Sequence, residues 1–531
     1  MWTVGFRASG WRATAGRCHN PFAATVADSA SRRRHPHREA PLHRLHGNPF
    51  ATRTAATDAD LMFEPAIAPS ASLLGLLQRG RGDGTLHALA AERADALAAL
   101  EECVTRDPRL DWQVENRSLY YARLYMELEA PLQGLADHLF HVEDLLDEHE
   151  SRTGLALSVL GRLAGYGRRD ALLLLRRYAA VGSNWAWALD ELALWDEDDA
   201  LLALAGPVLE RFPDGPEGDA ELRATIRGAY EPRPWHLWAQ THPRVAAATE
   251  QAPFDLWQRQ LDRAAGAPAW STAAVLAWAD AQVGVGQEDF ERRVAAAARC
   301  LAAVAGPADR TLLLEAATTA QDGARCAALR HLSDHDDEQA PALFELAAAD
   351  ASRRTADFAL GSLPRMRGPR ITARARVWAA DPDGGPLADA AARLLAAAGG
   401  PEDAPLIVAA LRRGVSDGGA DHEGLPVLVE AAGRFAATAA VPVLRHIYAE
   451  TSSSQLRGGA ARSLAATDAH FPTGAAVECL WDCEESTREL AARHVLTKGD
   501  VRVLDRLRRL AADPGEEAEV HAAVRGRLSA G

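Results

Sequence analysis

The sequence predicts an all-α fold, an α-solenoid built from a stack of helical hairpins. Apolar residues recur with the 3.6-residue period of a helix, and the alternating Val/Ile/Thr runs typical of strands are absent. A helix-pair pattern, seen for example in residues 399–411 and again in 436–448, returns about every 32 residues in the C-terminal half. Such a period indicates stacked units, each of which buries its apolar face only against its neighbours.

The first segment, residues 1–61, differs from the rest of the chain. It is rich in Arg and His, is interrupted by prolines and has no helical periodicity. We expect a disordered extension, or sequence upstream of a start at Met62 rather than Met1. It is therefore excluded from the fold prediction.

The remaining chain is expected to form three parts. Residues 62–212 are predicted to be an N-terminal helical array, whose first helices, near 86–100 and 118–128, should be its capping pairs. Residues 213–270 contain seven prolines and four tryptophans, which predicts a junction of short helices and turns. Residues 271–531 are expected to form a C-terminal repeat array.

Within the C-terminal array the same kind of helix start recurs. Spacings between successive starts are 31, 29, 35, 37, 32 and 28 residues, as expected for helices of constant length joined by loops of variable length. The expected starts are near Arg310, Pro341, Arg370, Pro405, Pro442, Gly474 and Arg502.

Charge and composition exclude several classes of protein. After residue 60 the chain has 49 basic and 69 acidic residues, a net charge of −20, which is the wrong sign for a nucleic-acid binder. Six cysteines are too few for a disulfide framework and fit a reducing cytoplasm. No apolar run approaches the ~20 residues of a membrane-spanning helix, so no membrane partner is expected. Abundant Ala and Arg with a single lysine, Lys498, are typical of a high-GC bacterial genome.

The repeat units resemble HEAT repeats, in particular the short bacterial type found in phycobilisome-lyase-like, armadillo-type families. Residues 455–465 and 486–496 look like the second helix of such a repeat, with small residues at close helix contacts and Arg near the turn. The likeness extends over about 300–530 and is weaker over 155–210, and the family's Asp/Arg ladder is patchy. The resemblance implies a right-handed α-solenoid that serves as a scaffold. It implies no catalytic residue.

Two polar groups could suggest chemistry. Cys479 and Cys483 stand four residues apart, which would put both on one helix face, but a zinc site normally needs a second compact ligand pair. We interpret them as a buried thiol pair. The cluster at 331–338 is interpreted as a solvated loop before a helix. No metal, cofactor or catalytic site is therefore predicted.

The tryptophans are the strongest remaining signal. They are more numerous than small-residue repeats require, and indoles either pack cores or anchor protein interfaces. Both interpretations stay open: core or junction packing, or a groove for a partner. The candidate partner-binding residues are Trp185, Trp187, Trp195, Trp235 and Trp238.

Together these observations predict a non-enzymatic, cytoplasmic scaffold that binds a protein partner rather than nucleic acid or membrane. The acidic balance favours a partner with a basic surface. Two alternatives remain: a lyase- or chaperone-like factor acting on a cofactor-bearing protein, which rests on the resemblance alone, and a HEAT-like binder of DNA lesions. The oligomeric state is not predicted.

Overall fold

A computed structural model of the chain describes residues 67–108, 117–142, 150–250, 270–281, 287–335, 337–498 and 500–530. In these ranges the chain forms helices and turns and no strand, which confirms the all-α prediction. The predicted extension, residues 1–61, lies outside the described residues.

The helices fall into a first group before residue 251 and a second group after residue 269. The first group comprises α1 (Leu73–Gln78), α2 (Gly82–Ala90), α3 (Arg93–Thr105), α4 (Arg117–Glu127), α5 (Gln133–Leu139), α7 (Glu150–Gly165), α8 (Arg169–Val181), α9 (Trp185–Trp195), α10 (Asp198–Ala203), α11 (Ala205–Leu209), α12 (Pro216–Gly228), α13 (Arg233–Ala239) and α14 (Pro243–Glu250). The second group comprises α16 (Thr272–Asp280), α17 (Gln287–Val304), α18 (Arg310–Thr319), α19 (Asp322–Asp334), α20 (Ala340–Ala348), α21 (Arg353–Ser362), α22 (Pro369–Ala379), α23 (Pro386–Ala398), α24 (Ala404–Gly418), α25 (Leu425–Arg434), α26 (Val441–Glu450), α27 (Ser454–Thr467), α28 (Ala475–Cys479), α29 (Glu485–His494), α30 (Val501–Ala512) and α31 (Ala518–Ala530).

The predicted helix starts of the second group are confirmed to within one residue, from α18 at Arg310 to α30 at Val501. Proline in the first turn explains several of them, because its fixed φ suits that position and its missing N–H needs no partner there. Pro369 opens α22 and Pro386 opens α23, while Pro405 is the second residue of α24.

These helices pack in two rows. One row contains the second helix of each pair, and each helix in it contacts the next: α19, α21, α23, α25, α27, α29 and α31. The other row contains the first helices, which also contact one another in order: α18, α20, α22, α24 and α26. Arginines of the first row reach a carboxylate of the following unit: Arg310 to Asp337 at 2.7 Å, Arg376 to Asp403 at 2.6 Å and Arg445 to Asp468 at 2.6 Å. Among the described residues these pairs start from α18, α22 and α26, so the ladder is present at alternate units and is patchy, as the sequence indicated.

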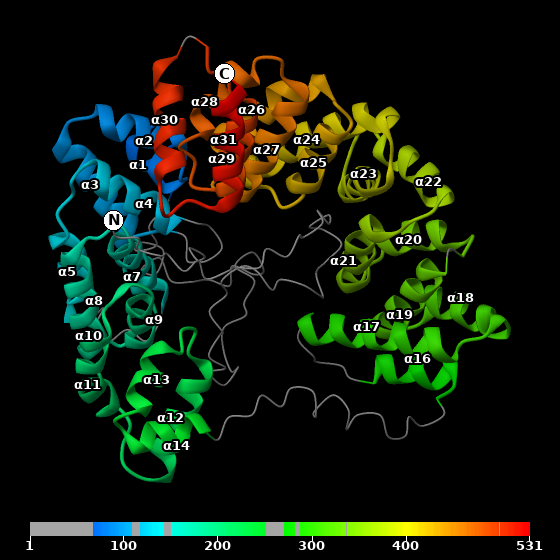
Figure 1. Cartoon of the computed structure of the whole chain (residues 1–531). Coiled ribbons are helices and arrows are strands. Elements are labelled where there is room, and N and C mark those ends of the chain that lie inside the picture. Colours follow the sequence, from blue (N-terminus) through cyan, green and yellow to red (C-terminus); the bar gives the residue numbers. More distant parts are fainter. Residues whose placement is uncertain are drawn as a thin grey trace, which may run out of the picture.

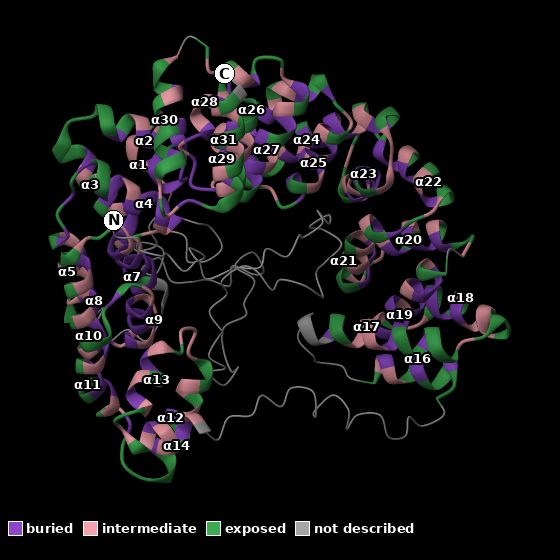
Figure 2. Ribbon diagram, in the orientation of Figure 1, coloured by how far each residue is buried: buried purple, intermediate pink, exposed green. Residues whose placement is uncertain are grey.

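Buried residues occur in both groups of helices (Figure 2). One apolar cluster of buried residues runs from Leu77 to Ala248 and a second runs from Val275 to Val524. The described part of the predicted junction, residues 213–250, forms α12 to α14 and packs on the first cluster. The domain boundaries themselves stay a prediction.

The first helices that the structure describes, α1 to α4, meet the last ones, a contact that local sequence patterns did not predict. The helices follow an arc from α16 to α31, and α1 to α14 continue the same arc (Figure 1). Helix α2 packs against α28, and Cys483 belongs to the apolar cluster of the first group. The prediction that α2 to α4 are capping pairs is wrong, since this end of the array is covered by the last repeats.

Candidate functional site

The candidate site is a contact between two parts of the chain, which we call the seam. One part consists of residues 68–127 together with Tyr166, and the other consists of residues 448–516. The seam's closest approach is at the turn between α1 and α2. Gly80 has φ +66°, and a Cβ there would lie 2.5 Å from the Cys483 sulfur. The Cys483 N–H donates to the Gly80 carbonyl at 3.0 Å. A Cβ on Gly82 would overlap the backbone oxygen of Glu478, so glycine at both positions lets the two backbones touch.

Arg81, between these glycines, anchors the first side of the seam. Its buried guanidinium donates to the Glu478 carboxylate at 2.9 Å, to the Ala449 carbonyl at 3.1 Å and to Asp83 at 3.1 Å. It also lies over the Tyr448 ring, 5.7 Å from its centre. Burial raises the pKa of Glu478, and the ion pair with Arg81 opposes that rise. One arginine thus links residues almost 400 positions apart.

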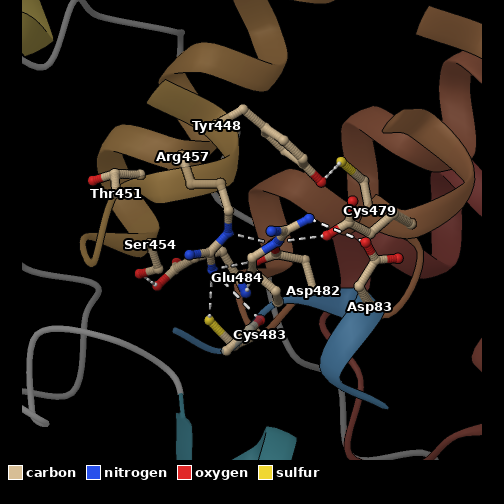
Figure 3. Close-up of polar contacts among 12 residues, drawn as sticks. Asp83, Tyr448, Thr451, Ser454, Arg457, Cys479, Asp482, Cys483 and Glu484 are labelled. Atoms are coloured by element: carbon tan, nitrogen blue, oxygen red, sulfur yellow. Dashed lines mark hydrogen bonds and ion pairs between the residues drawn. The ribbon is translucent and has the colours of Figure 1, made fainter. Parts of the chain in front are cut away.

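A second buried arginine, Arg457, supports the segment that receives this turn (Figure 3). Its Nε donates to Asp482 at 2.8 Å and one Nη lies 3.4 Å from the Cys483 sulfur. Both members of the Arg457–Asp482 pair are fully buried. Ser454 donates to Glu484 at 2.6 Å beside them. A buried pair of this kind is costly to break, because removing one partner leaves an uncompensated charge.

The thiols of this region do not form a pair. The sequence placed Cys479 and Cys483 on one helix face, but α28 ends at Cys479, and Cys483 lies in the loop before α29. Cys479 contacts the Tyr448 hydroxyl at 3.2 Å, whereas Cys483 faces Gly80. Burial raises the pKa of Cys479, which keeps its thiol protonated and unreactive. Among the described residues no group of three or more His, Cys, Asp or Glu side chains could hold a metal ion.

The second side of the seam joins α4 and Tyr166, the residue after α7, to the loop between α30 and α31. Arg123 donates to Asp513 at 2.8 Å and to Glu516 at 3.0 Å, and Tyr166 donates to Asp513 at 2.9 Å. Glu516 also accepts two hydrogen bonds from Arg488, at 2.7 and 2.8 Å. Burial alone would raise the pKa of Glu516, but Arg488 and Arg123 lower it to about 2. Burial raises the pKa of Tyr166 to about 12.

A cavity of about 540 Å³ opens beside this second network. Both ends of the chain supply its walls, through α2, α4, α30 and the loop that carries Trp481. A cavity of about 520 Å³ lies on the other side of the seam, beside Arg81, Arg445 and Arg502, and each of these arginines has a carboxylate partner. The two cavities therefore differ in whether every arginine in the wall has a carboxylate partner.

Four of the five candidate tryptophans lie in the core. Trp185, Trp187, Trp235 and Trp238 are buried, and the rings of Trp235 and Trp238 are 4.9 Å apart. The Trp187 indole donates to Ser158 at 3.2 Å and that of Trp238 to the Leu201 carbonyl at 2.8 Å. All four side chains are thus packed within the chain, and the indole N–H groups of Trp187 and Trp238 are paired there. A direct role in partner binding stays a prediction.

Trp195 is the exception. It is the last residue of α9, its side chain covers Gly165, and 48% of the residue is exposed. Exposed carboxylates follow it in α10 to α12 and the adjoining turns, and five of them form no ion pair with any residue that the structure describes. These five are Glu197, Asp199, Glu210, Glu217 and Glu221. We call Trp195 with these five carboxylates, which follow one another along residues 195–221, the acidic face.

The polar cluster at 331–338 differs from the expected solvated loop. His331 is buried in the last turn of α19, and its ring lies 4.1 Å from that of His335. Burial lowers the pKa of His331. Asp337 is bound by Arg310. The loop interpretation is therefore wrong for His331, which is buried in α19, whereas His335 and Glu338 are exposed between α19 and α20 as expected.

Comparisons with protein-family models and with curated proteins find no match for this chain. Its function must be argued from its own residues. In the ranges that the structure covers, no helix is both long enough and apolar enough to cross a membrane. The seam offers strongly held arginines and carboxylates with buried thiols, an arrangement that fixes structure.

Proposed function

We propose that the protein is a non-enzymatic cytoplasmic scaffold, a right-handed HEAT-like α-solenoid that binds a protein partner with a basic surface. The partner would bind the acidic face beside Trp195. The seam would hold the array in one shape, so that little ordering is needed when the partner binds.

The solenoid assignment is supported by the regularity of the second group of helices. Its first and second helices pack in two separate rows, and arginine–carboxylate pairs from α18, α22 and α26 reach the following unit at offsets of 27, 27 and 23 residues. Each unit thus contacts mainly its neighbours, which is the property of a repeat array. Scaffolds commonly use this architecture to present an extended surface.

The acidic face is the single observation that supports the choice of partner. Five exposed carboxylates without an arginine partner occur within 25 residues, and Arg211 is the only basic residue between Glu197 and Glu221. Like charges at this density attract a basic surface and speed its encounter. Trp195 adds a half-exposed indole, a side chain that often supplies binding energy at interfaces. Charge would then steer the partner and Trp195 would retain it.

The proposal is tested by quantitative affinity capture from the native host. We compare the wild type with Trp195→Ala and with a Glu197→Gln/Asp199→Asn variant. The matched control is Asp417→Asn/Glu423→Gln, which removes two exposed carboxylates of the C-terminal half that also lack an ion pair with a described residue. A basic protein should be retained by the wild type and the control and be depleted at least about fivefold by both acidic-face variants, about 1 kcal/mol.

Helix content and melting temperature are measured for each variant, so that loss of binding is separated from loss of structure. If the same proteins are retained by all variants, the acidic face is not the interface. If the purified protein instead retains duplex DNA at physiological salt, the DNA-lesion alternative replaces the proposal.

A further inference from the structure

The cavity at the second side of the seam has the size of a small-molecule site. Its volume of about 540 Å³ lies within the ~300–1,000 Å³ typical of ligand pockets. Residues from α2 and α4 form one wall, and residues from α30 and the Trp481 loop form the other. A ligand in it would touch both ends of the chain.

Arg506 is the exceptional residue in this cavity. Its Nε donates to the Leu480 carbonyl at 3.1 Å, and its guanidinium lies 5.3 Å from the centre of the Trp481 ring. It forms no ion pair with any described residue. The nearby carboxylates, Asp513 and Glu516, are already held by Arg123 and Arg488. Three arginines thus share two carboxylates, and one positive charge is left at the cavity wall.

An uncompensated charge in such a place is costly unless an anion joins it. Burial and the two neighbouring arginines lower the pKa of Arg506 to about 9, which still leaves the guanidinium charged at neutral pH. A planar carboxylate matches the fork geometry of a guanidinium. The charge pattern therefore favours one carboxylate as the head group of a ligand.

The rest of the wall is partly charged and partly apolar. Arg509 and Glu127 form an ion pair at 2.8 Å, and the exposed Glu129 forms no ion pair with any described residue. Leu89 and Met126 are 43% and 37% exposed, although they are large apolar residues, and Leu124, Trp481 and Pro514 continue the surface. The two tyrosine hydroxyls at the cavity are occupied, since Tyr120 donates to the Arg81 carbonyl at 2.8 Å and Tyr166 donates to Asp513. Among the described residues, the wall thus combines one arginine without a carboxylate partner, Arg506, with an apolar surface and with one unpaired carboxylate, Glu129.

We propose that this cavity binds an apolar monocarboxylate, such as a medium-chain fatty acid, with its carboxylate on Arg506 and its chain against Leu89, Leu124 and Met126. Because both walls belong to the seam, the ligand stabilises the contact between the two ends of the chain. This site is separate from the acidic face and does not depend on the proposed function.

The test is isothermal titration calorimetry of the full chain with octanoate. 1-Octanol supplies the same chain without the charge, and acetate supplies the charge without the chain. We expect saturable binding of one octanoate with a Kd below about 1 mM and at least tenfold weaker binding of both comparison compounds. Octanoate should also raise the melting temperature.

Variants then assign the site. Arg506→Gln should weaken octanoate binding at least tenfold, and Arg506→Lys should retain part of it, because Lys keeps the charge and loses the fork. Met126→Asp should also weaken binding, and it should fold because Met126 is partly exposed. The control Arg525→Gln removes an exposed arginine of α31 and should bind like the wild type. The melting temperature of Arg506→Gln without ligand should not fall, since a half-buried charge without a carboxylate partner is removed.

Other outcomes overturn the proposal. Equal binding of octanoate and acetate would indicate a simple anion site, and equal binding of octanoate and octanol would leave Arg506 without a role. Unchanged octanoate binding in Arg506→Gln and Met126→Asp would place the ligand elsewhere, and absence of saturable binding would remove the site. Should Arg506→Gln fail to fold, Arg506→Lys and Met126→Asp still decide between these outcomes.

Discussion

Neutralising Glu516 tests the physical account of the seam most directly. This carboxylate is fully buried and accepts hydrogen bonds from Arg488 and Arg123. In Glu516→Gln the shape is kept while the charge is lost, which leaves both guanidiniums undercompensated. A pKa of about 2 against an ordinary value of 4.5 corresponds to about 3 kcal/mol, at 1.36 kcal/mol per unit. The same magnitude is typical for removal of one partner of a buried pair, ~3–5 kcal/mol.

The pH dependence gives the sign of the effect. Because the pKa of Glu516 is lower in the folded state, its stabilising contribution is fully present above pH 4.5 and is lost as pH falls from about 4.5 to about 2. Wild type and Glu516→Gln should therefore differ by about 3 kcal/mol at pH 7, and the difference should shrink toward zero near pH 2.

Repeat arrays can unfold in parts, so the measurement should be local. Urea titration followed by hydrogen exchange of peptides from α29 and α31 reports the free energy of opening where Glu516 acts. Glu517→Gln is the matched control, because Glu517 is the exposed neighbour of Glu516 and should behave as wild type. A difference below about 1 kcal/mol at pH 7, or one that does not depend on pH, would refute this explanation of the seam.

Three further predictions follow from other parts of the chain. Gly82→Ala introduces a Cβ that overlaps a backbone oxygen across the seam, so it should lower stability by about 1–3 kcal/mol while helix content is preserved. The control Gly206→Ala, whose Cβ would have no heavy atom within 4 Å, should not lower stability. Thermal melting of both variants measures the difference. Trp238→Ala should lower the free energy of unfolding by ~3–5 kcal/mol, because this side chain is fully buried. Trp195→Ala should lower it by about 1 kcal/mol or less, because Trp195 is half exposed. Equal losses in urea titrations of the two variants would contradict the assigned burial. Burial raises the pKa of Asp190 to about 7, so its contribution to stability is lost as pH rises from 3.8 to about 7. The stability of Asp190→Asn relative to wild type should then increase over that range and be constant above it, and a constant difference from pH 4 to pH 8 would argue against this burial effect.

The repeat helices could be predicted because their signals are local. Proline and acidic residues mark helix starts, and apolar spacing marks the buried face within a dozen residues. The same reasoning failed at Cys479 and Cys483, because a spacing of four indicates one face only while the helix continues, and α28 stops at Cys479. It also could not assign the tryptophans, since Trp238 and Trp195 differ in burial through their tertiary neighbours.

The seam was not predictable from local patterns. Its contacts join residues far apart in the chain, such as Arg123 and Asp513, and nothing in either segment alone names the other. One signal was present: the Gly80-Arg81-Gly82 triplet between two short apolar helices provides a close backbone approach and a charge. Such a triplet indicates a contact without identifying its partner. The unpaired Arg506 was equally hidden, because its lack of a carboxylate is visible only once its neighbours have been paired.

The meeting of the two chain ends has a consequence for synthesis of the protein on the ribosome. Ladder contacts join residues fewer than 30 positions apart, so each unit can pack soon after it emerges. Arg123 must instead wait for Asp513, 390 residues later. At the ~5–20 residues per second typical of translation this delay is roughly 20–80 s. During that time the glycine turn at Gly80 and the charged side chains of α2 and α4 lack the seam residues that later cover them. Helices α1 to α4 are therefore covered only after the segments that carry Glu478, Cys483 and Asp513 have been made.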